Sequence, residues 1–96
     1  MDKRIIIQQL KKVKPFLSKK YGLTELALFG SYSRNEETNL SDIDIMVDYQ
    51  NPMGLKYFDM VYDLEDLFKE KKVQVVSKGG IKPEYFERIK QDLIYA

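Results

Sequence analysis

Apolar residues along the chain follow two different periods, which predict a mixture of helices and strands. Spacings of three and four in residues 3–13 and 55–70 predict amphipathic helices. Short apolar runs bounded by turn residues predict strands at Leu26–Phe29, Ile43–Val47 and Lys72–Ser77. The pattern therefore predicts an α+β fold, in which a small mixed β-sheet carries its helices on one face.

The ends of these elements are set by proline and by turn residues. Pro15 predicts either a kink or a new helix that runs to about Lys20. Pro83 suits the first position of a last helix, expected to run through about Gln91. The apolar residues 93–96 either pack back on the sheet, which we favour, or belong to a partner surface. The second helix is expected to turn one apolar stripe to the core: Leu55, Phe58, Val61, Leu64 and Phe68.

Length and composition narrow the function classes. Ninety-six residues suffice for one core, so we expect a single domain over residues 1–96. No apolar run is long enough for a membrane span and no signal-peptide pattern is present, so we expect a cytoplasmic protein without membrane contact. The absence of cysteine and histidine excludes thiol and imidazole chemistry. An enzyme with this sequence must work through carboxylates, a metal ion and backbone donors.

The charges are segregated although the net charge is only +1. Residues 1–21 hold seven basic side chains and one acidic side chain. Residues 22–68 hold two basic and ten acidic side chains, and residues 69–96 hold seven basic and four acidic side chains. A negative middle suits a cation and argues against nucleic acid as a partner of that surface. The basic ends are interpreted mainly as solvated faces.

The candidate chemistry begins with Asp42 and Asp44. Side chains two apart on a strand point the same way, so these carboxylates share one face with Cα atoms roughly 6–7 Å apart. Like charges at that distance are costly unless a cation lies between them. Mg²⁺, which prefers oxygen ligands and keeps open positions, is the predicted metal. Asp48 shares the face but lies about 13 Å further along the strand, so we do not expect it to be a ligand.

The second half of the candidate site is Gly30-Ser31, directly after a predicted strand. Glycine permits a close backbone approach, and Ser31 is expected to open a short helix whose free N–H groups favour phosphate. Arg34 follows by three positions, either as a ligand for a triphosphate or carboxylate or as a plain surface arginine. Each motif alone has a purely structural explanation: Gly-Ser after a strand is commonly a turn, and Asp-x-Asp is commonly a solvated strand end. The ordered combination of strand, Gly-Ser, ten residues, Asp-x-Asp and strand is specific.

This ordered motif, within LALFGSYSR and DIDIMV, resembles the signature of the DNA polymerase β-type nucleotidyltransferase superfamily. The short chain is similar to the minimal nucleotidyltransferases, the MNT antitoxins that are paired with HEPN toxins. The resemblance implies a polymerase β palm-like core and a transfer of AMP from ATP to a hydroxyl of the partner toxin, on a tyrosine. It implies that Asp42 and Asp44 hold Mg²⁺ and act in catalysis, and that Gly30, Ser31 and Arg34 bind the nucleotide.

One position departs from the family pattern. Related nucleotidyltransferases commonly carry a third carboxylate on the strand at residues 72–77, where this chain has Gln74. An amide accepts a hydrogen bond but takes up no proton, so Gln74 favours an alternative: a catalytically impaired homologue that neutralises its partner by binding. A third, weaker hypothesis is a nucleic-acid-binding module that uses the basic ends. Because nothing is left over for an acceptor-binding domain, a partner protein or a second copy, as a homo-oligomer, must supply that surface.

Overall fold

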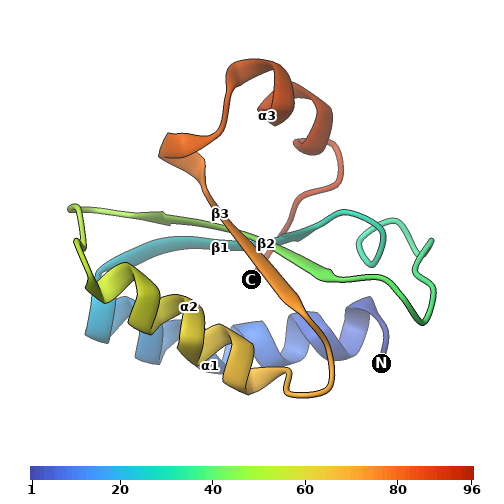
Figure 1. Cartoon of the computed structure of the whole chain (residues 1–96), viewed down its shortest axis with the longest axis horizontal. Helices are drawn as coiled ribbons and strands as arrows, with labels where there is room; N and C mark the ends of the chain where they lie inside the picture. The colour runs from blue at the N-terminus through green and yellow to red at the C-terminus, as the bar shows by residue number, and fades with distance from the viewer.

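The computed structural model describes all residues, 1–96, as a four-stranded mixed sheet with three α-helices (Figure 1). The predicted α+β class with a small mixed sheet is confirmed. The elements in chain order are α1 (Lys3–Tyr21), β1 (Leu23–Phe29), β2 (Ile43–Tyr49), α2 (Lys56–Leu67), β3 (Val73–Ser77), the 3₁₀ turn η1 (Lys78–Gly80), α3 (Pro83–Ile89) and β4 (Ile94–Tyr95).

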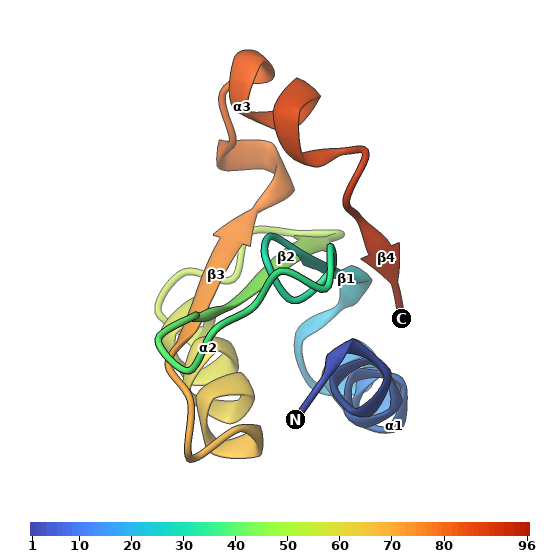
Figure 2. The ribbon, with the colours of Figure 1, turned by 90° about the vertical axis from the view of Figure 1, so that its right-hand side faces the viewer.

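The strands lie in the order β3-β2-β1-β4. β2 runs antiparallel to β1 and parallel to β3, and the crossover between the parallel strands is made by α2. The short β4 pairs antiparallel with β1, on the side away from β2 (Figure 2). The N–H of Ala96 donates to the carbonyl of Leu26 at 2.8 Å, so the apolar C-terminal residues pack back on the sheet as expected.

The two faces of the sheet are covered by different helices. Every second strand residue, including Leu26, Leu28 and Ile45, points into the main core, which α1 and α2 cover. The intervening residues, Phe29 and Met46 among them, face the other way and pack against Ile89 of α3 in a smaller cluster. The expected placement of helices on one face therefore holds for α1 and α2. It was wrong for α3, which lies over the opposite face (Figure 1).

Helix α1 is continuous through Pro15, which excludes the second of the two expected alternatives, a kink or a new helix. Proline lacks an N–H, and the carbonyl four residues earlier, at Lys11, loses its helical partner. Both residues are exposed, so water replaces that bond. Gly22 ends the helix in the left-handed conformation, and its N–H donates to the carbonyl of Ser18. None of the helices has the length and apolar character to cross a membrane.

Helix α2 presents a different stripe to the core from the one expected. Met60 and Leu64 are fully buried, whereas Leu55 and Phe58 are 83% and 68% exposed. Leu55 precedes the helix, and Phe58 lies about 120° around the helix axis from the centre of the buried stripe. Phe68, just past the last turn, is buried as expected. The prediction assigned every apolar residue at helical spacing to the core, although one face of the helix meets water.

This orientation of α2 gives a paired test. Met60→Ala is expected to lower the free energy of unfolding by about 2–5 kcal/mol, because it leaves a cavity in the core. Phe58→Ala is expected to change it by less than about 0.5 kcal/mol, because the side chain is at the surface. Urea unfolding followed by circular dichroism measures both. Equal losses for the two variants would contradict the orientation.

Candidate active site

Gly30 lies against the carboxylate of Asp44 in the candidate site. In the antiparallel register Phe29 lies opposite Asp44, so Gly30 follows directly beside the aspartate. A Cβ placed on Gly30 would lie 3.0 Å from Cγ of Asp44 and closer still to its Oδ2. Gly30 also has φ +80°, a left-handed conformation that glycine adopts without strain. Two independent constraints thus require glycine here, and both bring the two halves of the motif together.

The turn after Gly30 leaves its first amides free. The N–H of Arg34 donates to the carbonyl of Gly30 at 3.2 Å, and the N–H of Glu36 donates to that of Ser31 at 2.8 Å. The N–H groups of residues 31–33 donate to no acceptor within the chain. The expected short helix is therefore a single turn. Consecutive free amides next to a glycine form the kind of concavity that binds anionic oxygen.

Asp42 and Asp44 form a strained pair of like charges. Burial raises the pKa of Asp44, the negative charge of Asp42 raises it further, and the positive charge of Arg34 acts in the opposite direction. A raised pKa means that the folded protein disfavours the ionised carboxylate. A bound cation removes that penalty, and two carboxylates are the hard oxygen donors that Mg²⁺ takes. The two carboxylates therefore fit Mg²⁺. They are the only protein carboxylates available to it, since no group of three or more Asp, Glu, His or Cys side chains is assembled.

Gln74 lies beside this pair. It is the register partner of Asp44 in the parallel pairing of β2 and β3, and its side chain is exposed. Its Nε2 donates to Oδ2 of Asp42 at 3.0 Å. The amide thus occupies the place beside the carboxylates where the family resemblance expects a third acid. It donates a hydrogen bond to Asp42 and adds no charge to the site.

Arg34 is held by two acids. Its Nε donates to Glu36 at 2.9 Å and its Nη1 to Asp92 at 2.8 Å. Asp92 is fixed in turn, because its carbonyl accepts from the hydroxyl of the buried Ser33. Arg34 is therefore neither an isolated surface residue nor free. A phosphate has to replace carboxylate partners that are already in place.

A cavity of about 380 Å³ brings most of these residues together. Gly30, Ser31, Arg34 and Asp44 line it, while Asp48 lies in a different depression, with Ser77 and Gly79. The opposite wall, which comes from α3 and the residues after it, was not predicted from the sequence. The signal available in the sequence was the helical spacing of Tyr85, Arg88 and Ile89 in the predicted last helix. The residues of this wall are Tyr85, Arg88, Ile89 and Asp92, and Phe29 at the end of β1 also lines the cavity.

Comparison with known proteins shows the family of the chain. Residues 10–96 match the nucleotidyltransferase domain, and the chain belongs to that family. A candidate protein adenylyltransferase of Methanocaldococcus jannaschii is 48% identical over 88 residues, which cover 90% of this chain and 89% of that protein. The protein adenylyltransferase MntA of Thermococcus cleftensis is 32% identical over 80 residues, covering 82% of this chain and 80% of MntA.

Solved structures agree with this assignment. A candidate minimal nucleotidyltransferase superposes with a TM-score of 0.81 at 25% identity, covering 98% of this chain and 95% of that one. A mutant MntA-HpeT toxin–antitoxin structure superposes with a TM-score of 0.68 at 19% identity, covering 99% of this chain and 72% of that one. At that identity the second match supports the fold alone.

The contact between Gly30 and Asp44 can be tested by substitution, with Gly22 as the matched control. Gly22 also has positive φ but has open space at the Cβ position. Gly22→Ala is expected to cost about 1 kcal/mol of unfolding free energy from the backbone alone. Gly30→Ala is expected to cost more, because the new methyl group displaces Asp44.

In an Asp44→Ala background the methyl group of Gly30→Ala meets no carboxylate. The difference between the two glycine variants is then expected to shrink to within about 0.5 kcal/mol, as for sites that no longer interact. Urea unfolding of the six proteins measures it. A difference that persists without the Asp44 carboxylate would refute the contact.

Proposed function

We propose that this protein is a Mg²⁺-dependent protein adenylyltransferase that moves AMP from ATP to a hydroxyl of a partner protein. The observation that carries the proposal is the direct apposition of the Gly30-Ser31 turn and the Asp44 carboxylate in one cavity. An anion-binding turn next to a cation-binding carboxylate pair suits a metal-bound triphosphate. The names of the relatives in the same family agree with this activity.

In the proposed reaction, the hydroxyl oxygen of the acceptor forms a bond to the α-phosphorus of ATP, and the bond to pyrophosphate breaks. Asp42 and Asp44 would hold Mg²⁺, which when bound supplies charge neutralisation for the phosphates. The free amides of residues 31–33 and the guanidinium of Arg34 orient the leaving pyrophosphate and stabilise its charge. The proton of the acceptor hydroxyl passes to an aspartate of the site or to solvent, because Gln74 cannot take it up.

The proposed partner is a HEPN-type toxin, modified on a tyrosine, which makes this chain an antitoxin. This assignment is supported by the resemblance to MNT antitoxins and by the relative named MntA. The exposure of Gln74 beside Asp42 also supports a protein-borne acceptor, because it leaves the start of β2 accessible to a partner.

Co-expression with the protein encoded by the neighbouring gene tests the activity. Intact-mass spectrometry is expected to show whole AMP units on that protein with wild type and none with Asp44→Asn. Because Asp44→Asn removes a disfavoured charge, its melting temperature without Mg²⁺ is expected to equal or exceed that of wild type. Loss of modification is then not a consequence of unfolding. An unmodified partner beside the wild-type chain would refute the transferase.

A second candidate function is neutralisation of the partner by binding alone. The hydrogen bond from Gln74 to Asp42 favours this second function, because Asp42 has a partner there without a metal ion. Gln74 also stands where related enzymes carry a group that takes up protons. Under this alternative the partner remains unmodified but still forms a stable complex with the chain.

Gln74→Glu separates the two functions. The new carboxylate loses the hydrogen bond to Asp42 and adds a third negative charge, so the melting temperature without divalent ions is expected to fall. Addition of Mg²⁺ is expected to raise it by more than in wild type. For an enzyme limited by its missing base, the rate of AMP transfer rises by roughly 10²- to 10⁴-fold. An unchanged response to Mg²⁺ would show that residue 74 does not face the metal site.

A further inference from the structure

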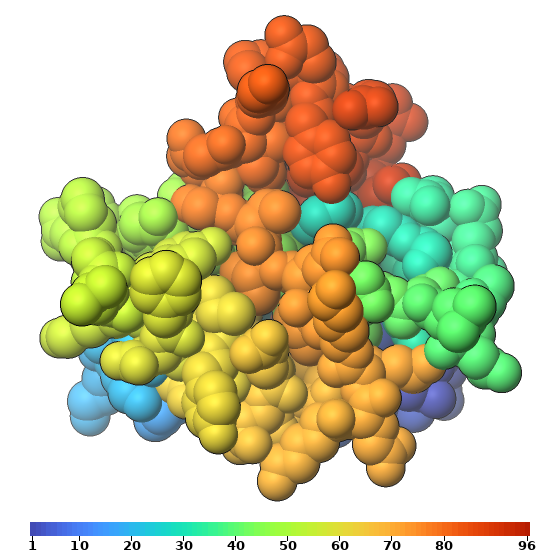
Figure 3. Space-filling view, in the orientation of Figure 1, coloured from blue at the N-terminus to red at the C-terminus, as the bar shows by residue number.

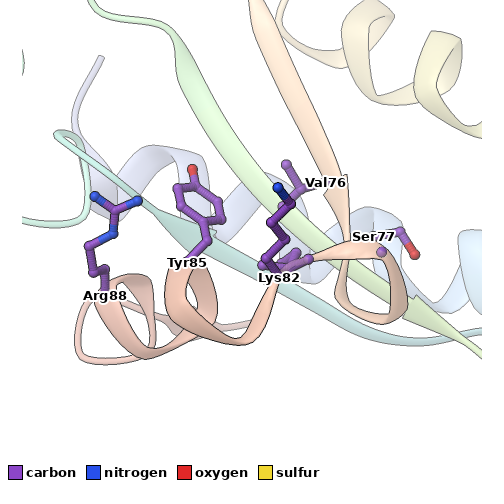
Figure 4. A pocket seen from close by; sticks show the side chains of 7 residues that line it. Val76, Ser77, Lys82, Tyr85 and Arg88 are labelled. Carbon is purple, nitrogen blue, oxygen red and sulfur yellow. The ribbon is translucent and has the colours of Figure 1, made fainter.

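A second cavity, of about 520 Å³, lies between β3 and residues 80–89, which include α3 and are called the α3 segment. Val76 of β3 and Ile81 contribute apolar surface. Lys82, Tyr85 and Arg88 project from the same side of the α3 segment (Figure 4). We call this cavity the α3 groove. The space-filling view shows the α3 segment rising from the body of the molecule above β3 (Figure 3).

The α3 groove continues the candidate active site. Tyr85 and Arg88 line both the α3 groove and the cavity that holds Gly30 and Asp44. Val76 is two residues beyond Gln74 on β3, so both side chains belong to the sheet face that carries Asp44. A ligand bound at Gly30 and Asp44 therefore has a direct way past Tyr85 and Arg88 into the α3 groove.

We propose that the α3 groove binds the nucleoside of the nucleotide, with the aromatic base against Tyr85. This inference rests on the proposed function and adds to it the binding place of the base. The triphosphate lies at the Gly30-Ser31 turn, its α-phosphate lies near Asp44, and the nucleoside extends from there across β2 and β3. Arg88 stands at the junction of the two cavities, where its charge meets the phosphates.

Tyr85 is built as a platform. The ring is 37% exposed, although it belongs to an apolar helical stripe. Its position is fixed by an edge-to-face contact with Phe29, with ring centroids 6.4 Å apart, and by the guanidinium of Arg88, 5.6 Å from the ring centroid. A fixed and partly exposed aromatic ring can stack with any nucleobase, because every base has a π-face.

The acceptor has a different approach. The α3 groove, of about 520 Å³, has the volume of a small-molecule site. The start of β2 is open, because Gln74 is exposed and Leu40, two residues before Asp42, is 93% exposed. A hydroxyl on a partner protein reaches the α-phosphate from that end without entering the α3 groove.

The test compares ATP with inorganic tripolyphosphate, each with Mg²⁺, by isothermal titration calorimetry. Tyr85→Ser is expected to weaken ATP binding by about tenfold, the effect of losing one base–aromatic stack, and to leave tripolyphosphate binding unchanged. Tyr62→Ser, at a 66% exposed tyrosine of α2, is the matched control and is expected to change neither. In ¹⁵N–¹H spectra of the wild-type protein, ATP is expected to shift the amide signals of Val76 and Ile81. Tripolyphosphate is expected to leave these two signals unshifted.

The outcomes separate this inference from the proposed function. If wild type binds ATP but Tyr85→Ser binds it equally well, or if tripolyphosphate binding weakens as much as ATP binding, the nucleoside site is overturned and the nucleotidyltransferase proposal stands. Unshifted signals of Val76 and Ile81 with bound ATP overturn it as well. If wild type binds neither ATP nor tripolyphosphate, the proposed function fails, and the nucleoside site fails with it.

Discussion

The candidate site depends on one contact, the carboxylate of Asp44 against the backbone of Gly30. That contact follows from the antiparallel register of β1 and β2, which places Phe29 opposite Asp44. The register is set by the core, because Leu28 and Ile45 must face α1 and α2. A slip by one residue would turn Asp44 into the apolar core. The hydrophobic pattern of two strands thus determines where the charges of the site lie.

Those parts of the site that are local in sequence were predictable. Asp42 and Asp44 lie two residues apart at the start of a strand, so the alternation of side chains was enough to place these two carboxylates on one face. The wall formed by Tyr85, Arg88 and Asp92 was not predictable in the same way. Its position depends on α3 folding over the far face of the sheet, and no local pattern specifies which face a terminal helix covers.

The errors in the fold prediction have a common physical source. The apolar spacing of Leu55 and Phe58 and the proline at position 15 both suggested local preferences that tertiary structure overrides. An exposed helix face tolerates a large apolar side chain, and an exposed turn of helix tolerates a missing N–H, because water meets both. Burial decides such cases, and burial is a property of the whole fold.

The order of the elements along the chain has a consequence for synthesis. The larger core is formed by α1, β1, β2, α2 and β3, all of which leave the ribosome before α3 and β4. Domains begin to fold from the N-terminal side during translation. The Gly-Ser turn and the aspartate pair can therefore meet in a nascent chain whose second wall is still untranslated. Tyr85, Arg88, Ile89 and Asp92 line the cavity on that side, so the growing polypeptide completes its candidate nucleotide site only after these residues have been added.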